Sequence, residues 1–122
     1  MEIALEHLDG RPACERCLLA DTFLTRLRGL LGRPALGEGE GMLIRPANSI
    51  HTWFMRSVID AVFLDRDLVV VHVAPDMKPW RFAGRRGSRF VLEVAAGESA
   101  RRGIERGARL RLKQAEPAGG DR

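Results

Sequence analysis

The chain is divided into short apolar segments by glycine, proline and aspartate residues. Within the segments, apolar and polar residues alternate or β-branched residues predominate, and both patterns are typical of β-strands. The expected strands lie within residues 1–12, 14–20, 42–44, 50–55, 58–64, 68–74, 89–95 and 109–112. Residues 75–87, which contain two prolines and two glycines, are expected to form a long irregular connection.

Two helices are predicted among these strands. Apolar residues at spacings of three and four predict an amphipathic helix near residues 22–31. Asp21 or Thr22 is placed to act as its N-cap, because either side chain can accept an amide hydrogen of the first turn. A helix of one or two turns is expected at residues 98–102, where Gly103 permits a left-handed C-cap.

The order of these elements indicates an α+β fold. We expect a compact single domain with a curved, mainly antiparallel, barrel-like sheet, one main helix and a short C-terminal helix. A chain of 122 residues is long enough to bury one core without disulfides or structural metals. Residues 1–112 are assigned to this domain, and residues 113–122 to a flexible C-terminal tail.

The composition argues against several classes of protein and partner. The 45% hydrophobic and 30% charged residues are typical of a soluble globular protein, and no apolar run is long enough to span a bilayer. The N-terminal residues lack the pattern of a secretory signal, so a cytoplasmic location is expected. The net charge of +4 comes mainly from arginines interspersed with acids, which argues against nucleic acid as a partner.

The stretch 49–65 combines aromatic, sulfur-containing, imidazole and charged groups. If residues 65–67 form a three-residue hairpin loop, Asp60 falls opposite His72 on one face of two paired strands. A charge-assisted hydrogen bond between them would raise the pKa of His72 and suit the pair to acid–base catalysis. The alternative is structural, with Asp60 as a cap or an arginine partner and His72 as a half-buried histidine.

The same stretch contains candidate ligand-binding residues. His51, Trp53 and Met55 share one face of the expected strand, and an apolar wall with a few polar groups is typical of small-molecule sites. The alternative is that this face belongs to the core. For Arg56, the alternatives are an anionic ligand and a salt bridge with Asp60 across a tight turn.

Residues 53–65 resemble the signature segment of the family called domain of unknown function 192 (DUF192), a set of small uncharacterised bacterial and archaeal proteins. The resemblance extends in order over about residues 18–112 and includes residues 26–33, 41–44 and 91–97. It implies a compact, sheet-rich α+β fold and no established activity. It also favours Glu93 as a buried acid near the face of Asp60 over a solvent-facing residue.

Cys14 and Cys17 have the CxxC spacing of zinc sites and redox motifs. One pair is only half a zinc site, and no histidine stands at a spacing that would complete it. The expected position is a turn or a strand edge, not the start of a helix as in thioredoxin-like motifs. Incidental thiols, a metal site and a disulfide or redox role remain as alternatives.

A second cluster combines basic and aromatic residues. Arg81, Arg85 and Arg86 lie close to Trp80 and Phe82, a combination that binds phosphate or RNA through charge and stacking. The alternative is a solvated loop, since loops collect charged residues without a binding role.

The sequence lacks a P-loop, a dinucleotide-binding glycine pattern, a nucleophile elbow and a His-Glu-x-x-His motif. We therefore expect a small soluble binding or accessory module for a small molecule or a protein, with a pocket near the central hairpin and no cofactor. One alternative is a small enzyme that uses Asp60 with His72 or Glu93. Another is an anion- or RNA-binding protein that uses residues 81–89.

Overall fold

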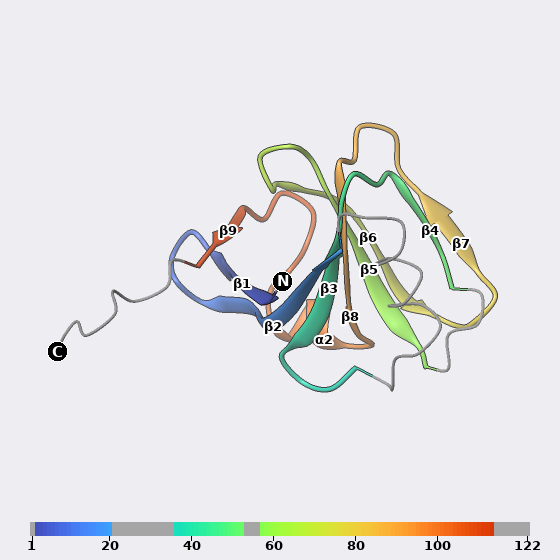
Figure 1. Ribbon diagram of the computed structural model, residues 1–122, viewed down its shortest axis with the longest axis horizontal. Helices are drawn as coiled ribbons and strands as arrows, with labels where there is room; N and C mark the ends of the chain where they lie inside the picture. Colours follow the sequence, from blue (N-terminus) through green and yellow to red (C-terminus); the bar gives the residue numbers. More distant parts are fainter. Residues whose placement is uncertain (1, 21–35, 53–56, 114–122) are drawn as a thin grey trace, which may run out of the picture.

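The computed structural model describes residues 2–20, 36–52 and 57–113 (Figure 1). The predicted main helix lies outside these residues, as do Trp53, Met55, Arg56 and residues 114–122 of the predicted tail. The described part contains β1 (Glu2–His7), β2 (Pro12–Ala20), β3 (Glu40–Ile44), β4 (Ser49–His51), β5 (Ile59–Leu64), β6 (Val70–Met77), β7 (Phe82–Gly84), β8 (Phe90–Ala95), α2 (Glu98–Arg101) and β9 (Leu110–Leu112).

Seven of the strands form one sheet in the order β6-β5-β8-β3-β2-β1-β9, and β4 and β7 form a separate pair. Every neighbouring pair is antiparallel except β2 and β3, so the predicted mainly antiparallel sheet is confirmed. The sheet is not closed into a barrel. Its edges approach at one point, where Val69 forms an isolated bridge with Arg109. The structure thus supports an α+β fold, but not the barrel-like part of the prediction.

Strand β5 explains how the core is organised. All six of its residues are buried, and it lies between β6 and β8 in the sheet (Figure 1). Val62 and Leu64 belong to one buried apolar cluster, whereas Ala61 and Phe63 belong to a second. Because alternate residues of a strand point to opposite faces, both faces of β5 are covered. This accounts for its nearly continuous apolar sequence.

The connection predicted at residues 75–87 is less irregular than expected. Strand β6 continues through Pro75 to Met77, and residues 82–84 form β7 against β4. Proline is tolerated at an edge of a sheet, where its missing amide hydrogen removes no ladder bond, and β6 is an edge strand. The prediction was wrong because it treated Pro75 as the end of a strand.

The β5–β6 loop is longer than the predicted three residues. Leu64 pairs with Val70, so residues 65–69 connect the strands. The Asp65 side chain accepts hydrogen bonds from the amides of Asp67 and Val69, at 2.9 and 3.0 Å, and stabilises the loop. The extra residues and an irregular register change which residues of β5 and β6 face each other.

The predicted cap at the end of α2 is confirmed. Gly103 has a φ of 68°, and its amide donates to the carbonyl of Ala100 at 3.4 Å. The amide of Ile104 donates to the carbonyl of Ser99 at 2.8 Å, and these two bonds define a Schellman motif. Ile104 is 2% exposed and packs into the core, which fixes α2 below β5 and β8. No helix among the described residues has the length and apolar character needed to cross a membrane.

Candidate functional site

Asp60 is a buried structural carboxylate. It is 1% exposed, and its Oδ1 accepts a hydrogen bond from the amide of Asp76 at 3.0 Å. Its Oδ2 accepts from the amides of Gly97 and Ser99, at 3.1 and 3.0 Å, and from the Ser99 hydroxyl at 2.6 Å. The amides at 97 and 99 begin α2, where backbone donors have no partner within the helix. Asp60 therefore caps α2 from a neighbouring strand.

The predicted contact between Asp60 and His72 is wrong. His72 pairs with Phe63, which is three residues from Asp60 along β5. Three residues of a strand span about 10 Å, too far for a hydrogen bond between the two side chains. The physical reason is the longer loop and the irregular register of β6, which place His72 opposite Phe63, near the loop end of the hairpin.

Glu93 is buried, as the family resemblance suggested, at 0% exposure. It pairs with Ala61, whereas Asp60 pairs with Val94. Neighbouring residues of a strand point to opposite faces, so the carboxylates of Glu93 and Asp60 lie on different sides of the sheet. The three catalytic candidates therefore do not converge, and the predicted acid–base site is not formed.

His72 instead contacts one of the predicted anion-binding residues. Nη2 of Arg85 lies 3.0 Å from Nδ1 of His72. Burial lowers the pKa of His72, and the positive charges of Arg85 and Arg106 lower it further. Since a guanidinium can only donate, Nδ1 accepts this hydrogen bond, and the proton of the neutral imidazole lies on Nε2.

We call the hollow beside this contact the edge pocket, because it lies along the edge strand β6. Its volume is about 430 Å³, within the range of small-molecule sites. In the described part of the chain, neither Arg85 nor Arg106 forms an ion pair. The lining residues are His72, Val73, Pro75, Arg85, Ser99, Ala100, Gly103, Ile104, Glu105 and Arg106. The pocket thus combines apolar residues with two arginines that have no ion-pair partner among the described residues.

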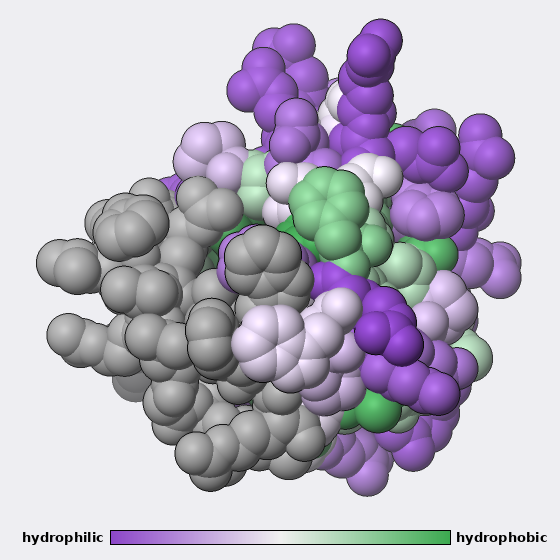
Figure 2. Space-filling view, turned by 90° about the vertical axis from the view of Figure 1, so that its right-hand side faces the viewer, coloured by the Kyte–Doolittle hydropathy of each residue, from purple (hydrophilic) through white to green (hydrophobic). Residues whose placement is uncertain are grey.

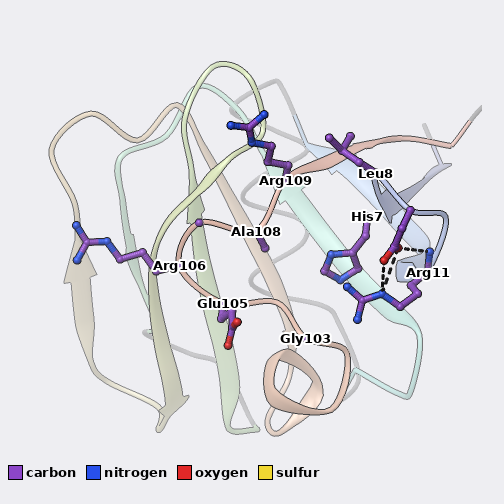
Figure 3. A pocket seen from close by; sticks show the side chains of 10 residues that line it. His7, Leu8, Arg11, Gly103, Glu105, Arg106, Ala108 and Arg109 are labelled. Carbon is purple, nitrogen blue, oxygen red and sulfur yellow. Dashed lines mark hydrogen bonds and ion pairs between the residues drawn. The ribbon is translucent and has the colours of Figure 1, made fainter.

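A second hollow of about 530 Å³ lies on the other side of the segment 103–106. Figure 3 shows His7 and Arg11 at this hollow, with Arg106 pointing away from them. Two polar side chains of this hollow, His7 and Arg11, already have partners among the described residues. Nε2 of His7 lies 2.8 Å from the carbonyl of Arg102, and Arg11 forms an ion pair with Asp9. Arg106 lines both hollows, but only the edge pocket adds Arg85 and His72, which are in contact, and it is therefore the better candidate despite its smaller volume.

The predicted anion-binding arginines are separated in the structure. Arg81 and Arg85 lie at opposite ends of β7, and Arg86 does not line the edge pocket. Sequence reasoning missed Arg106, which the C-terminal segment after α2 brings beside His72. No local pattern could indicate it, because the two residues meet only through the link between residues 68–70 and 107–110.

The loop after β6 exposes two aromatic side chains. Trp80 is 58% exposed and Phe82 is 68% exposed, and Figure 2 shows hydrophobic groups on this face bordered by hydrophilic ones. The buried Thr52 hydroxyl shapes the loop, donating to the carbonyl of Lys78 at 2.6 Å and accepting from the amide of Arg81 at 2.8 Å. The face also carries His51, which pairs with Phe82.

Cys14 and Cys17 form no disulfide and are buried within β2, a strand between β1 and β3. This differs from the expected turn or strand edge, because β3 pairs with the second side of β2. Among the described residues, no group of three or more His, Cys, Asp or Glu side chains is arranged to hold a metal ion.

Several known proteins are similar to this chain in sequence, and a solved structure is similar to it in fold. A UPF0127 protein of Thermococcus sibiricus is 34% identical over 72% of this chain, which spans 60% of that protein's length. A UPF0127 protein of Pyrococcus furiosus is 33% identical over 75% of this chain and 81% of its own length. The crystal structure of a protein of unknown function from Novosphingobium aromaticivorans has a TM-score of 0.75 and 26% identity, with 91% of this chain and 84% of that chain covered.

The resemblance proposed from the sequence is confirmed and extends further toward the N-terminus than expected. The DUF192 family, described as "Uncharacterized ACR", matches residues 6–112 and thus includes most of the N-terminal hairpin. The relatives named above are likewise of uncharacterised function, so the comparison supports the fold and adds no activity. The chain belongs to the DUF192 family.

Proposed function

We propose that this protein is a binding module that recognises a small anionic ligand in the edge pocket. The observation that carries the proposal is the position of Arg85 and Arg106. Both line a hollow of about 430 Å³, and their positive charges both lower the pKa of His72 there. A carboxylate, sulfate or phosphate group placed there would receive charge-assisted hydrogen bonds, which are stronger than neutral ones.

The neutral imidazole of His72 would supply one directed hydrogen-bond donor to this site. Arg85 occupies Nδ1 of His72, so Nε2 is the remaining donor and is available to an acceptor on the ligand. Glu105 also lines the pocket, and its carboxylate would repel a second negative group. These groups favour a ligand with one anionic group and a neighbouring hydroxyl or ammonium donor.

Binding is better supported than acid–base catalysis. An enzyme needs its acid and base at one reacting centre, whereas Asp60 and Glu93 are buried on opposite faces of the sheet. Both oxygens of Asp60 already accept hydrogen bonds from the fold. His72 is the one catalytic candidate that remains beside the pocket, and a lone neutral imidazole is sufficient for recognition.

The test is calorimetric titration with inorganic sulfate at constant ionic strength, using wild type and single variants. Arg85→Gln and Arg106→Gln each remove a charge from the pocket, and we expect each to weaken sulfate binding about tenfold, equivalent to about 1.4 kcal/mol. Arg86→Gln is the matched control, because Arg86 is exposed and does not line the pocket. Equal binding by all four proteins, or no binding by wild type, would reject the proposal.

A further inference from the structure

The two cysteines face the same side of β2 because the strand contains a bulge. On the neighbouring strand, Ile3 pairs with Cys17 and Leu5 pairs with Cys14. One residue of β1 therefore lies opposite two residues of β2, Glu15 and Arg16. In a regular strand, residues three apart point to opposite faces, whereas an extra residue restores the same face. Both thiols consequently point inward.

Contacts on β3 and the preceding loop confirm this arrangement. The amides of Glu15 and Arg16 both donate to the carbonyl of Gly39, at 2.9 and 2.8 Å, as expected where a strand bulges. The Cys14 thiol lies 3.7 Å from the same carbonyl oxygen. A Cβ atom on Gly41 would lie 2.8 Å from Sγ of Cys14, so the sulfur occupies space that only glycine leaves open.

Cys17 and a nearby positive charge both favour the thiolate of Cys14. A hydrogen bond from the Cys17 thiol lowers the pKa of Cys14 by more than burial raises it, and the Arg102 guanidinium lowers it further. Cys14 also lines a hollow of about 180 Å³ between the ends of β1 and β2. Cys14 is 1% exposed and lines this hollow, whereas Cys17 is 0% exposed and does not line it, so a small molecule that enters the hollow would meet Cys14 first.

We propose that Cys14 and Cys17 form a reversible redox pair that is oxidised to an intrachain disulfide by hydrogen peroxide or another small hydroperoxide. Thiolates react faster than thiols, and a low-pKa cysteine beside a second, resolving cysteine is the usual arrangement in redox-sensitive proteins. The inference does not depend on the edge pocket, from which the residues lining the small hollow are wholly distinct.

Two steps complete the oxidation. The Cys14 thiolate attacks one oxygen of hydrogen peroxide, the O–O bond breaks, and the departing hydroxide takes up a proton to become water. The Cys17 thiol then attacks the sulfur of the resulting Cys14 sulfenic acid, the S–O bond breaks, and its proton leaves with the hydroxide as a second water. Two thiols and one peroxide thus give one disulfide and two waters, and an external dithiol reverses the change.

The test is intact-mass spectrometry of the reduced full-length chain after peroxide treatment, denaturation and alkylation. We expect both alkylation sites to be lost together, with a mass lower by two hydrogens than that of the reduced, unalkylated chain. Both sites should return after dithiothreitol. Glutathione in the same solution provides the comparator for an ordinary exposed thiol. Two thiols that stay alkylatable while glutathione is oxidised, or a disulfide between two chains, would overturn the proposal.

Single variants assign the order of the reaction. In Cys17→Ala, the sulfenic acid on Cys14 has no resolving thiol, so we expect it to be trapped by dimedone. In Cys14→Ala, we expect Cys17 to react at least about tenfold more slowly, because it is buried and does not line the hollow. Faster reaction of Cys17 than of Cys14 would contradict the assignment. The wild-type measurement decides the main question even if a variant does not fold.

Discussion

Asp60 and His72 belong to the same β5–β6 hairpin and have opposite surroundings. Asp60 lies on an inner strand and accepts four hydrogen bonds, three of them from backbone amides. His72 lies on the edge strand and faces a hollow, with Arg85 and Arg106 beside it. The inner strand buries polar groups only where the fold satisfies them, whereas the edge leaves room for a ligand.

This contrast separates the structural polar residue of the hairpin from the one that faces the proposed binding site. A buried carboxylate whose oxygens both accept hydrogen bonds from the fold contributes stability, but at 1% exposure Asp60 is out of reach of a substrate. Arginines around an open pocket keep their hydrogen-bonding capacity for a ligand. Polar residues of the inner strand should therefore affect stability, and those of the edge pocket should affect binding.

The largest expected effect comes from Asp60→Asn. Asparagine would replace one carboxylate oxygen with an NH2 group. Its N–H donors would then face backbone N–H groups that now donate hydrogen bonds to Asp60. We expect the free energy of unfolding to fall by about 3 kcal/mol, because hydrogen bonds to a charged group are lost and buried donors remain unpaired. Urea denaturation followed by circular dichroism measures this change.

Asp65→Asn is the matched control for this prediction. Asp65 also accepts two backbone amides, but it lies at a partly exposed loop where water can replace the lost partner. We expect a loss of at most about 1 kcal/mol. Equal losses for the two variants would break the contrast between the inner strand and the exposed loop.

Thr52→Val should have the next largest effect. Thr52 is 0% exposed, and its hydroxyl bonds the backbone of the loop at residues 78 and 81. Valine has nearly the same shape and leaves those groups unpaired, so we expect a loss of about 2 kcal/mol. Thr52→Ser retains the hydroxyl and should lose less, as measured in the same denaturation assay. A larger loss for serine would show that packing of the methyl group is the dominant contribution.

The sequence predicted local features well and the site poorly, for one physical reason. Alternation and turn residues located nearly every described strand, and Gly103 predicted the cap of α2. These features depend on residues close in the chain. The pairing of Asp60 with His72 depended on loop length, and the longer loop with its irregular register moved the partner away.

Local sequence patterns could not predict contacts between residues of distant segments. Arg106 meets His72 only because the chain after α2 pairs with the start of β6. Likewise, the spacing of Cys14 and Cys17 suggested a reactive pair, but the bulge that turns both thiols inward follows from pairing with β1. In both cases the residue types were informative, and the tertiary structure decided which of them act together.

A smaller effect tests the charge of the edge pocket. Glu105 is exposed and is the carboxylate that lines the pocket, so Glu105→Gln should strengthen sulfate binding about threefold through loss of a partly screened repulsion. The free energy of unfolding should stay within about 0.5 kcal/mol of wild type, as for most exposed positions. Asp67→Asn, an exposed acid in the β5–β6 loop, is the control and should change neither quantity. A similar gain in both variants would indicate a general charge effect and no defined site.

The smallest effect concerns the protonation of His72. Burial and the neighbouring arginine charges lower its pKa below the ordinary value of 6.5. The unfolded chain therefore takes up a proton on this histidine near pH 6.5, whereas the folded chain does so only at lower pH. As pH falls from 6.5 to the pKa of the folded state, His72 makes the fold less stable. His72→Gln should remove that part of the pH dependence, while His51→Gln, outside the pocket, should retain it.

Sulfate binding should show the opposite dependence on pH. The charge of sulfate is constant between pH 5 and 8, to within about 0.1 charge, whereas protonation of His72 adds a positive charge to the pocket. Bound sulfate in turn raises the pKa of His72, because an opposite charge favours the charged form of imidazole. Affinity measured by calorimetry should therefore rise as pH falls below 6.5 in wild type and stay flat in His72→Gln. The same rise in both proteins would place the titrating group elsewhere and separate His72 from the anion site.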